Sequence, residues 1–330
     1  MEHISAFVAA QVTANGRAQK NDFGDPLAES VENLRRAIKA REEHEGKSQP
    51  AVQEVKNTVL QFPSPFGDDT RAVSNKIARC ALFAAVKKRQ FFRDYVTVGE
   101  VGGVKIEFCG EQLNQDDHDT LMQLIFSANH KPLGVDVCAS VNAVLKGLGR
   151  DTYQEQRRQL FEQISRLVRG TIRLTLPNMP RYEGHLLDDA STPQDQAILP
   201  QYRRHLVYRL NPKFARFFGR MEVTLIDWQD RLKISGRGSE LAKWLHLHIE
   251  SHAEQYSMKA ETIRDRSGSQ TKELKHFRAI LRQALDLLKD AGIITAWSID
   301  AGDLVHIERI PSPAQIKHIE KKAKCRKPIK

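Results

Sequence analysis

The sequence predicts an α+β protein with two winged-helix domains in tandem, each a helix-turn-helix unit followed by a β-hairpin wing. The main observation is a repeated order of elements. Three helical patterns followed by two strand patterns occur between residues 116 and 187, and the same order recurs between residues 239 and 308. When the first set is shifted by 121 residues, four apolar positions coincide with the second set: Leu160 with Leu281, Ile164 with Leu285, Leu167 with Leu288, and Ile172 with Ile293.

The length and composition agree with two domains. The chain has 330 residues, of which 40% are hydrophobic, and about 150 residues form a typical domain with its own core. We expect an N-terminal extension and linker over residues 1–75, a first domain over 76–230, a second domain over 231–310, and a basic tail over 311–330. Apolar runs are shorter than the roughly 20 residues that cross a bilayer, which excludes a membrane span.

Several features favour a cytoplasmic location. No basic residue precedes the apolar stretch at the N-terminus, as one would in a secretory signal. The four cysteines form no CxxC pair and are expected to be reduced thiols: Cys80, Cys109, Cys138 and Cys325.

The net charge favours a polyanionic partner. The chain has 51 Lys and Arg residues against 41 Asp and Glu residues, a formal net charge of +10. Residues 1–70 hold 8 basic and 11 acidic residues, whereas the last twenty hold 7 basic residues and 1 acidic residue. A basic body with a denser basic tail favours nucleic acid as the partner. The alternative is a basic soluble protein whose tail only keeps it in solution.

The N-terminal third is expected to contain a charged amphipathic helix over Val31–Glu45 and a linker around the prolines of Phe62–Asp69. A short helix is predicted over Asn75–Phe83. Alternating apolar residues predict a hairpin with strands Tyr95–Val98 and Val104–Cys109.

The first repeated unit is expected to begin with a helix at Asp116, because acidic residues at a helix start offset its dipole. A short helix follows over Ser140–Leu148. The third helix is capped by Asp151 or Thr152 and ends near Arg169. The two strands lie at Ile172–Leu176 and Gly184–Leu187. The segment Pro177–Arg204 is expected to be a wing loop or an insert between the domains.

The second unit has the same layout. Ser239 is expected to cap its first helix, which runs through Ile249. A second helix is expected over Lys259–Arg264 and a turn over Asp265–Ser269. A long helix over Thr271–Asp290 and two strands, Ile293–Ser298 and Asp303–Glu308, complete the unit.

The third helix of a winged helix enters the major groove, and its hairpin contacts the backbone beside it. In the second unit an apolar stripe predicts the buried face: Leu274, Phe277, Leu281, Ala284 and Leu288. Basic residues lie largely off this stripe, and Ser269 and Thr271 precede them. We therefore expect six DNA-binding residues: Ser269, Thr271, Lys272, Lys275, Arg278 and Arg282. Lys and Arg bind phosphates or guanine edges, and hydroxyl groups do either more weakly.

The third helix of the first unit has a similar polar face. Its candidates for DNA contact are Gln154, Arg157, Arg158 and Ser165. Gln154 and Gln156 are candidate adenine readers, because an amide can pair in both directions with that base. The alternative is that both faces are simply solvated.

The sequence does not support catalysis, a cofactor or a metal site. Gly46-Lys47-Ser48 matches only the end of a phosphate-binding loop, because Arg41 stands where that loop needs glycine. His248 and His252 are four residues apart, but no third ligand is suggested. We therefore expect a protein that is not an enzyme.

An ordered series of short segments resembles the TrfA-type plasmid replication initiators. The segments are Ala78–Phe83, then Lys105-Ile106 with Gly110 and Leu113, then Gly147–Gly149, and finally Asp303–His306. The resemblance runs from about residue 76 to residue 309.

This resemblance implies a protein that binds repeated sequences, called iterons, in double-stranded DNA at a plasmid origin. It also implies opening of an adjacent AT-rich segment, recruitment of the host replicative helicase and initiator, and a homodimer in equilibrium with the monomer. In such a complex the two third helices would contact grooves about 10 base pairs apart.

Three alternatives remain open at this point. A winged-helix repressor would bind an inverted repeat as a stable dimer. An interaction scaffold would show no DNA binding. An unrecognised enzyme would cleave supercoiled DNA with a metal ion.

Overall fold

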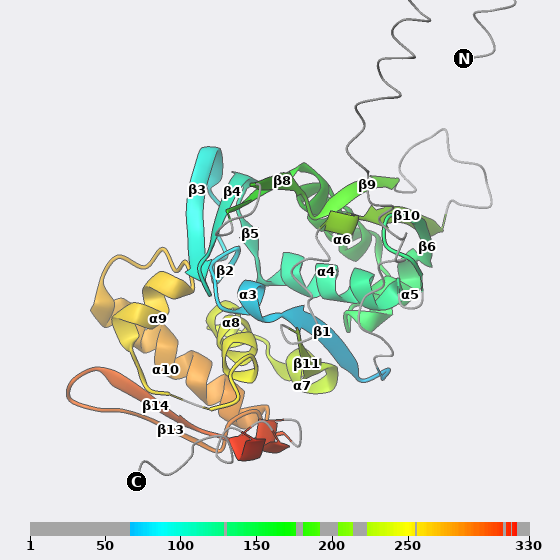
Figure 1. The fold of residues 1–330 in the computed structure, drawn as a ribbon. Coiled ribbons are helices and arrows are strands. Elements are labelled where there is room, and N and C mark those ends of the chain that lie inside the picture. Colours follow the sequence, from blue (N-terminus) through cyan, green and yellow to red (C-terminus); the bar gives the residue numbers. More distant parts are fainter. Residues whose placement is uncertain are drawn as a thin grey trace, which may run out of the picture. The chain divides into compact units, whose positions relative to one another are not determined.

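The computed structural model describes residues 67–321, apart from 129–130, 176–180, 192–203, 214–222, 255, 313–314 and 318. All of them belong to one compact unit of mixed α/β structure (Figure 1). The expected helix at Val31–Glu45, most of the expected linker and the end of the basic tail lie outside the described residues. None of the helices within these ranges is long and apolar enough to cross a bilayer.

The larger part of the fold precedes residue 228. Its elements are β1 (Thr70–Ser74), α3 (Asn75–Ala78), β2 (Phe83–Ala84), β3 (Phe91–Val101), β4 (Val104–Glu111), β5 (Leu113–Asn114), α4 (Gln115–Ser127), β6 (Asp136–Ser140), α5 (Val141–Gly147), α6 (Gln154–Arg169), β7 (Thr171–Thr175), β8 (Tyr182–His185), β9 (Leu187–Ser191), β10 (His205–Leu210) and β11 (Val223–Asp227).

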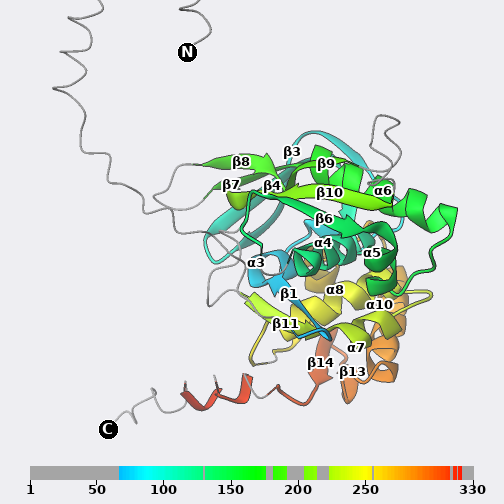
Figure 2. The same cartoon turned by 90° about the vertical axis from the view of Figure 1, so that its right-hand side faces the viewer.

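Two larger antiparallel sheets accompany the helices of this part, besides the antiparallel pair β1–β11 and the parallel pair β2–β5. One has the strand order β3-β4-β7-β8 and the other the order β6-β10-β9. Both lie on the same side of α4, with α6 beside them (Figures 1 and 2). Apolar side chains of α4, α5, α6 and both sheets form one continuous core, so the three helices and the first hairpin are fixed to each other.

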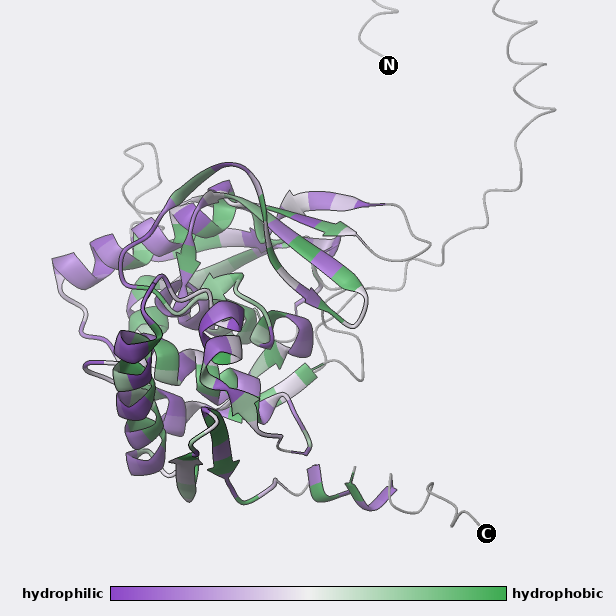
Figure 3. Ribbon diagram, turned by 90° about the vertical axis from the view of Figure 1, so that its left-hand side faces the viewer, coloured by the Kyte–Doolittle hydropathy of each residue, from purple (hydrophilic) through white to green (hydrophobic). Residues whose placement is uncertain are grey.

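The smaller part follows in the chain. Most of its buried apolar residues form a second core, but Trp228 and Leu247 pack in the core of the larger part. Its elements are α7 (Trp228–Lys233), α8 (Ser239–Glu250), β12 (Met258–Lys259), α9 (Ala260–Arg266), α10 (Leu274–Asp290), β13 (Ala296–Ile299) and β14 (Leu304–Glu308). The hairpin β13–β14 pairs with β12. Hydrophilic and hydrophobic residues alternate around the long helices in Figure 3, as expected of helices that each bury one face.

The predicted order of helices and hairpins is present, but several boundaries differ. The last long helix begins at Leu274, with Glu273 as its N-cap, so Thr271 and Lys272 precede the helix. The N-cap of α8 is Gly238, whose φ of 89° suits glycine, and not Ser239. The N-cap of α6 is Tyr153, and not Asp151 or Thr152.

The short helix predicted over Asn75–Phe83 ends at Ala78. Leu82 and Phe83 instead lie in or beside β2, which pairs with β5 and is buried in the larger core. At the start of α4, the cap is Asn114, which forms a capping box with Asp117.

The expected loop or insert over Pro177–Arg204 is also different. Its described residues form β8 and β9, which pair with β7 and with β10. Tyr182 and Leu187 are buried in the core, so this segment belongs to the larger part of the fold. The edge strand β6 and its partner β10 were not predicted.

Candidate nucleic-acid interface

The helix α10 separates an apolar face from a basic one. Phe277, Leu281 and Leu288 are completely buried, as the predicted stripe requires. Lys275 and Arg282 are exposed on the helix, and Lys272 is exposed just before it. No ion pair within the described ranges engages these three side chains. Arg282 nevertheless lies close enough to Asp303 to help lower the pKa of that carboxyl group. Because none of the three side chains is held in an ion pair, each can bind an anion.

Arg278 behaves differently from its basic neighbours on α10. Its Nε and Nη2 atoms donate to the two carboxylate oxygens of Asp303, at 2.7 and 2.6 Å. The hydrogen bond from Arg278 lowers the pKa of Asp303. Asp303 lies in the turn between β13 and β14, at the positive φ of 67°. The prediction treated Arg278 as a free groove-reading side chain, whereas the structure joins it to the hairpin turn.

Two of the candidate DNA-binding residues on α6 already bind other side chains of the protein. Arg158 is exposed, but it lies between Glu155 and Glu162, with N–O distances of 2.7 and 2.6 Å. Arg157 is half-buried and donates to the Asn142 side chain at 2.9 Å. Gln154 is exposed at the start of the helix. Arg158 would have to exchange carboxylates for phosphates on binding DNA.

Ser165 lies further along α6, toward its C-terminal end, and lines a surface groove. The groove has a volume of about 920 Å³, and one of the residues that line it is Phe91, which is 70% exposed. Arg158 and Arg169 also line this groove. Ser165 is therefore separated from Gln154 by much of the helix length, and the two residues do not form one cluster.

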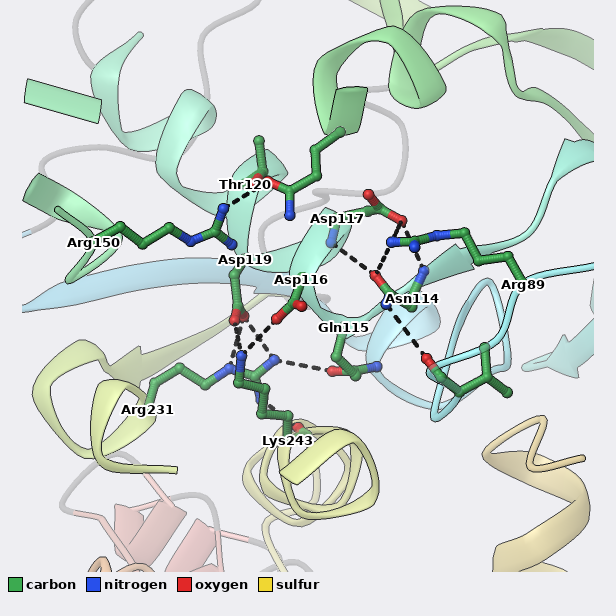
Figure 4. A network of polar contacts seen from close by, with 12 residues as sticks. Arg89, Asn114, Gln115, Asp116, Asp117, Asp119, Thr120, Arg150, Arg231 and Lys243 are labelled. Carbon is green, nitrogen blue, oxygen red and sulfur yellow. Dashed lines mark hydrogen bonds and ion pairs between the residues drawn. The ribbon is translucent and has the colours of Figure 1, made fainter. Parts of the chain in front are cut away.

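A buried ionic cluster joins the larger and smaller parts (Figure 4). Arg231 of α7 is fully buried, and its Nε donates to Asp119 of α4 at 2.9 Å. Lys243 of α8 lies 2.7 Å from the second oxygen of Asp119 and 2.9 Å from Asp116. Burial acts to raise the pKa of Asp119, but Arg231 and Lys243 outweigh it and hold this pKa well below the usual range. The acids of α4 thus pair with specific cations in addition to lying near the helix start.

The histidines of α8 are packing residues. His246 and His248 are buried, and burial lowers the pKa of each to about 3. The ring of His248 stacks on Trp244 with centroids 4.8 Å apart. Within the described residues, no three His, Cys, Asp or Glu side chains gather in a way that could hold a metal ion.

The ten predicted residues therefore fall into two separate groups. Four lie on α6, and six lie in the turn before α10 or on its first turns. Arg231 and Lys243 were not predicted from the sequence, because no local pattern marks a residue whose partner is more than 100 positions away.

Comparison with known proteins identifies relatives along most of the chain. A family model described as TrfA protein matches residues 19–309. The plasmid replication initiator protein TrfA of Escherichia coli is 24% identical over 321 residues, which cover 94% of this chain and 80% of that protein.

Two solved structures are also similar. The crystal structure of RctB domains 2–3 is 14% identical, with a TM-score of 0.49, and the match covers 73% of this chain and 98% of that one. The crystal structure of the Pi initiator protein in complex with iteron DNA is 12% identical, with a TM-score of 0.44, and the match covers 61% of this chain and 96% of that one.

Proposed function

This chain belongs to the TrfA family, and on that premise we propose that it is a plasmid replication initiator that binds iteron repeats at a plasmid origin. The observation that supports this most strongly is the family match over residues 19–309. The match favours an initiator over a winged-helix repressor. Binding would promote opening of the origin and recruit the host replication machinery.

The proposal includes two winged-helix units. The first consists of α4, α5 and α6 with the hairpin β7–β8, and the second of α8, α9 and α10 with the hairpin β13–β14. In each unit three helices precede a two-stranded antiparallel hairpin, and the third helix presents polar residues to solvent. A third helix and its wing are the usual means by which such a unit contacts a groove and the adjacent backbone.

The DNA contacts are assigned by exposure and charge. In the second unit, the unpaired cations Lys272, Lys275 and Arg282 would bind one groove, with Ser269 and Thr271 beside them. Arg278 would position the wing. In the first unit, Gln154, Arg157 and Arg158 would approach a second groove about 10 base pairs away.

The proposal also includes partners and location. The chain would act in the cytoplasm on double-stranded plasmid DNA, exchange between homodimer and monomer, and contact the host helicase and initiator. It would need no cofactor and would catalyse no reaction itself.

The test is binding of the purified full chain to tandem-repeat origin DNA and to a shuffled duplex, by fluorescence anisotropy across a salt series. The mass of free and bound protein is measured in parallel. Selective binding by several monomers per repeat array would support the initiator. Selective binding only as a stable dimer on an inverted repeat would favour a repressor, and equal binding to both duplexes would contradict the base-reading assignments. If about six phosphates are contacted, affinity falls about 10³-fold or more between 50 and 200 mM salt.

A further inference from the structure

A short connecting segment links β2 to β3 and lies between the larger and smaller parts. We call residues 85–89 the strap. The backbone N–H of Ala85 donates to the carbonyl of Ser267 at 2.8 Å, and the side chain of Gln270 donates to the carbonyl of Lys88 at 3.2 Å. Both partners belong to the turn between α9 and α10. This turn therefore holds one side of the strap.

The opposite side of the strap is fixed to α4. Arg89 donates to the N-cap side chain of Asn114 at 2.9 Å and pairs with the buried Asp117 at 3.3 Å (Figure 4). Arg89 thus points inward, whereas Lys87 and Lys88 are exposed. Contacts at both ends give the strap a defined path between the two units.

The turn before α10 approaches this region closely. A Cβ atom on Gly268 would lie 2.9 Å from the Cβ of Ala81 and 3.0 Å from that of Ala84, and Gly268 has a φ of 67°. Only glycine combines that backbone conformation with so little space. The residues that precede α10 are therefore packed against the residues that precede the strap.

Two surface clefts meet at the strap. One has a volume of about 440 Å³ and is lined by Lys87, Lys88, Arg237 and the residues Ser269–Thr271 before α10. The other has a volume of about 500 Å³ and is lined by Lys87 together with Gln159 and other residues of α6. Lys87 lines both clefts, so it lies between the entry to α10 and the side of α6.

The free charge in these clefts is positive. Lys87, Lys88 and Arg237 are exposed, and no ion pair within the described part of the chain engages them. Two of the three carboxyl groups that line the clefts are paired with cations.

Three carboxyl groups line these clefts. Asp116 pairs with Lys243, and Glu162 pairs with Arg158. The third, Glu240, is half-buried and lacks a partner at its Oε2 atom, and burial raises its pKa to about 7. An anion at the strap would therefore meet unpaired cations and little opposing charge.

We propose that Lys87 and Lys88 bind phosphates of the duplex between the two grooves contacted by α6 and α10. The inference rests on the proposed function, and it adds a third contact that neither helix provides. Lysine side chains on the strap bind backbone phosphates irrespective of sequence, because an ammonium group acts as a point charge. They increase affinity for any duplex, while the recognition helices supply selectivity.

The test replaces both lysines in the full chain. We expect Lys87→Gln/Lys88→Gln to weaken binding to iteron DNA and to a shuffled duplex by the same factor, which leaves the ratio of the two affinities unchanged. Loss of two phosphate contacts lowers the slope of log affinity against log salt by about 1.8. The factor by which the variant binds more weakly than the unmodified protein is then about 12-fold smaller at 200 mM than at 50 mM salt. The matched control is Lys131→Gln/Lys289→Gln, which removes the same charge from exposed positions outside both clefts and should leave the slope unchanged.

A second measurement locates the contact on the DNA. Neutral methylphosphonates are placed between the two groove sites of one iteron, and the unmodified protein should lose affinity there while the strap variant loses none. Equal losses by both proteins would overturn the proposal, as would an unchanged salt slope. If the unmodified protein fails to prefer iteron over shuffled DNA, the proposed function fails instead, which separates the two outcomes.

Discussion

Arg278 on α10 and Asp303 in the turn of the β13–β14 hairpin form a bidentate ion pair, with N–O distances of 2.7 and 2.6 Å. The pair joins the proposed recognition helix to the proposed wing. Bidentate pairs between guanidinium and carboxylate fix direction as well as distance. The angle between helix and hairpin therefore depends on this contact.

We expect Asp303→Asn to lower the preference for iteron over shuffled DNA by at most about fivefold, because an ion pair this close to solvent is weak. Asparagine tolerates the positive φ at this position, so the turn itself should survive. Anisotropy titrations with both duplexes measure the ratio. Asp290→Asn removes an exposed carboxylate at the other end of α10 and serves as the control. An unchanged ratio for Asp303→Asn would exclude a positioning role.

The free cations of α10 give a second expectation. Lys275→Ala and Arg282→Ala should each weaken iteron binding. If the side chain contacts a base, the loss should be about 1–3 kcal/mol and the preference for the iteron sequence should fall. A phosphate contact would instead lower the salt slope by about 1. Lys289→Ala, at the C-terminal end of the same helix, is the matched control. If neither variant changes binding, the assumed facing of α10 toward DNA is wrong.

The buried cluster predicts a large loss of stability. In Asp119→Ala the fully buried Arg231 loses its carboxylate partner, and we expect the free energy of unfolding to fall by about 3–5 kcal/mol. Replacing both residues, as in Asp119→Leu/Arg231→Met, should restore most of that loss because no charge is left unpaired. Urea unfolding measures the free energy of unfolding of both variants.

The control for this cluster is the exposed pair of Asp230 and Lys233, which lies on α7 close to Arg231. Asp230→Ala should change the free energy of unfolding by less than about 1 kcal/mol. A similar small change for Asp119→Ala would mean that the cluster is hydrated and contributes little.

Buried histidines should make the fold sensitive to mild acid. Burial lowers the pKa of His118, His246 and His248 to about 3, whereas a histidine in the unfolded chain titrates near 6.5. Below about pH 6.5 the unfolded state binds protons that the folded state does not. Stability is therefore complete above that pH and is lost as the pH falls toward 3, by up to about 1.4 kcal/mol per pH unit for each histidine.

Urea unfolding at pH 7.5, 6.5, 5.5 and 4.5 tests this dependence. His246→Gln should reduce the slope of stability against pH, while His276→Gln, at an exposed position on α10, should not. A flat profile from pH 6.5 to 4.5 would contradict neutral burial of these rings.

Much of the fold was predictable because its signals are local. The apolar stripe of α10 follows the helical period, and Phe277, Leu281 and Leu288 are buried as predicted. The strands around Gly102 and Gly103 alternate, and they form the hairpin of β3 and β4. The strands β6 and β10 escaped prediction because short strands are defined by their partners as much as by their own residues.

The candidate site was predicted less completely. Exposure of Lys275 and Arg282 follows from their position off the apolar stripe, which the sequence shows directly. The pairing of Arg278 with Asp303 required the hairpin to fold back toward the helix, across 25 residues of sequence. Similarly, the glutamates that pair with Arg158 are visible at helical spacing, but only the folded helix shows that they take up its guanidinium.

The sequence by itself determined the long helices, the hairpins that follow them, the apolar faces of these helices and the basic character of the chain, because these properties depend on residues a few positions apart. The tertiary structure decided which charges remain free. Arg231 and Asp119 are 112 residues apart in the chain yet pair in the interior, whereas Lys87 and Lys88 remain unpaired on the strap between the two units. Whether a charged side chain finds a partner depends on which elements pack around it. That packing involves residues far apart in the sequence, so no local pattern predicts it.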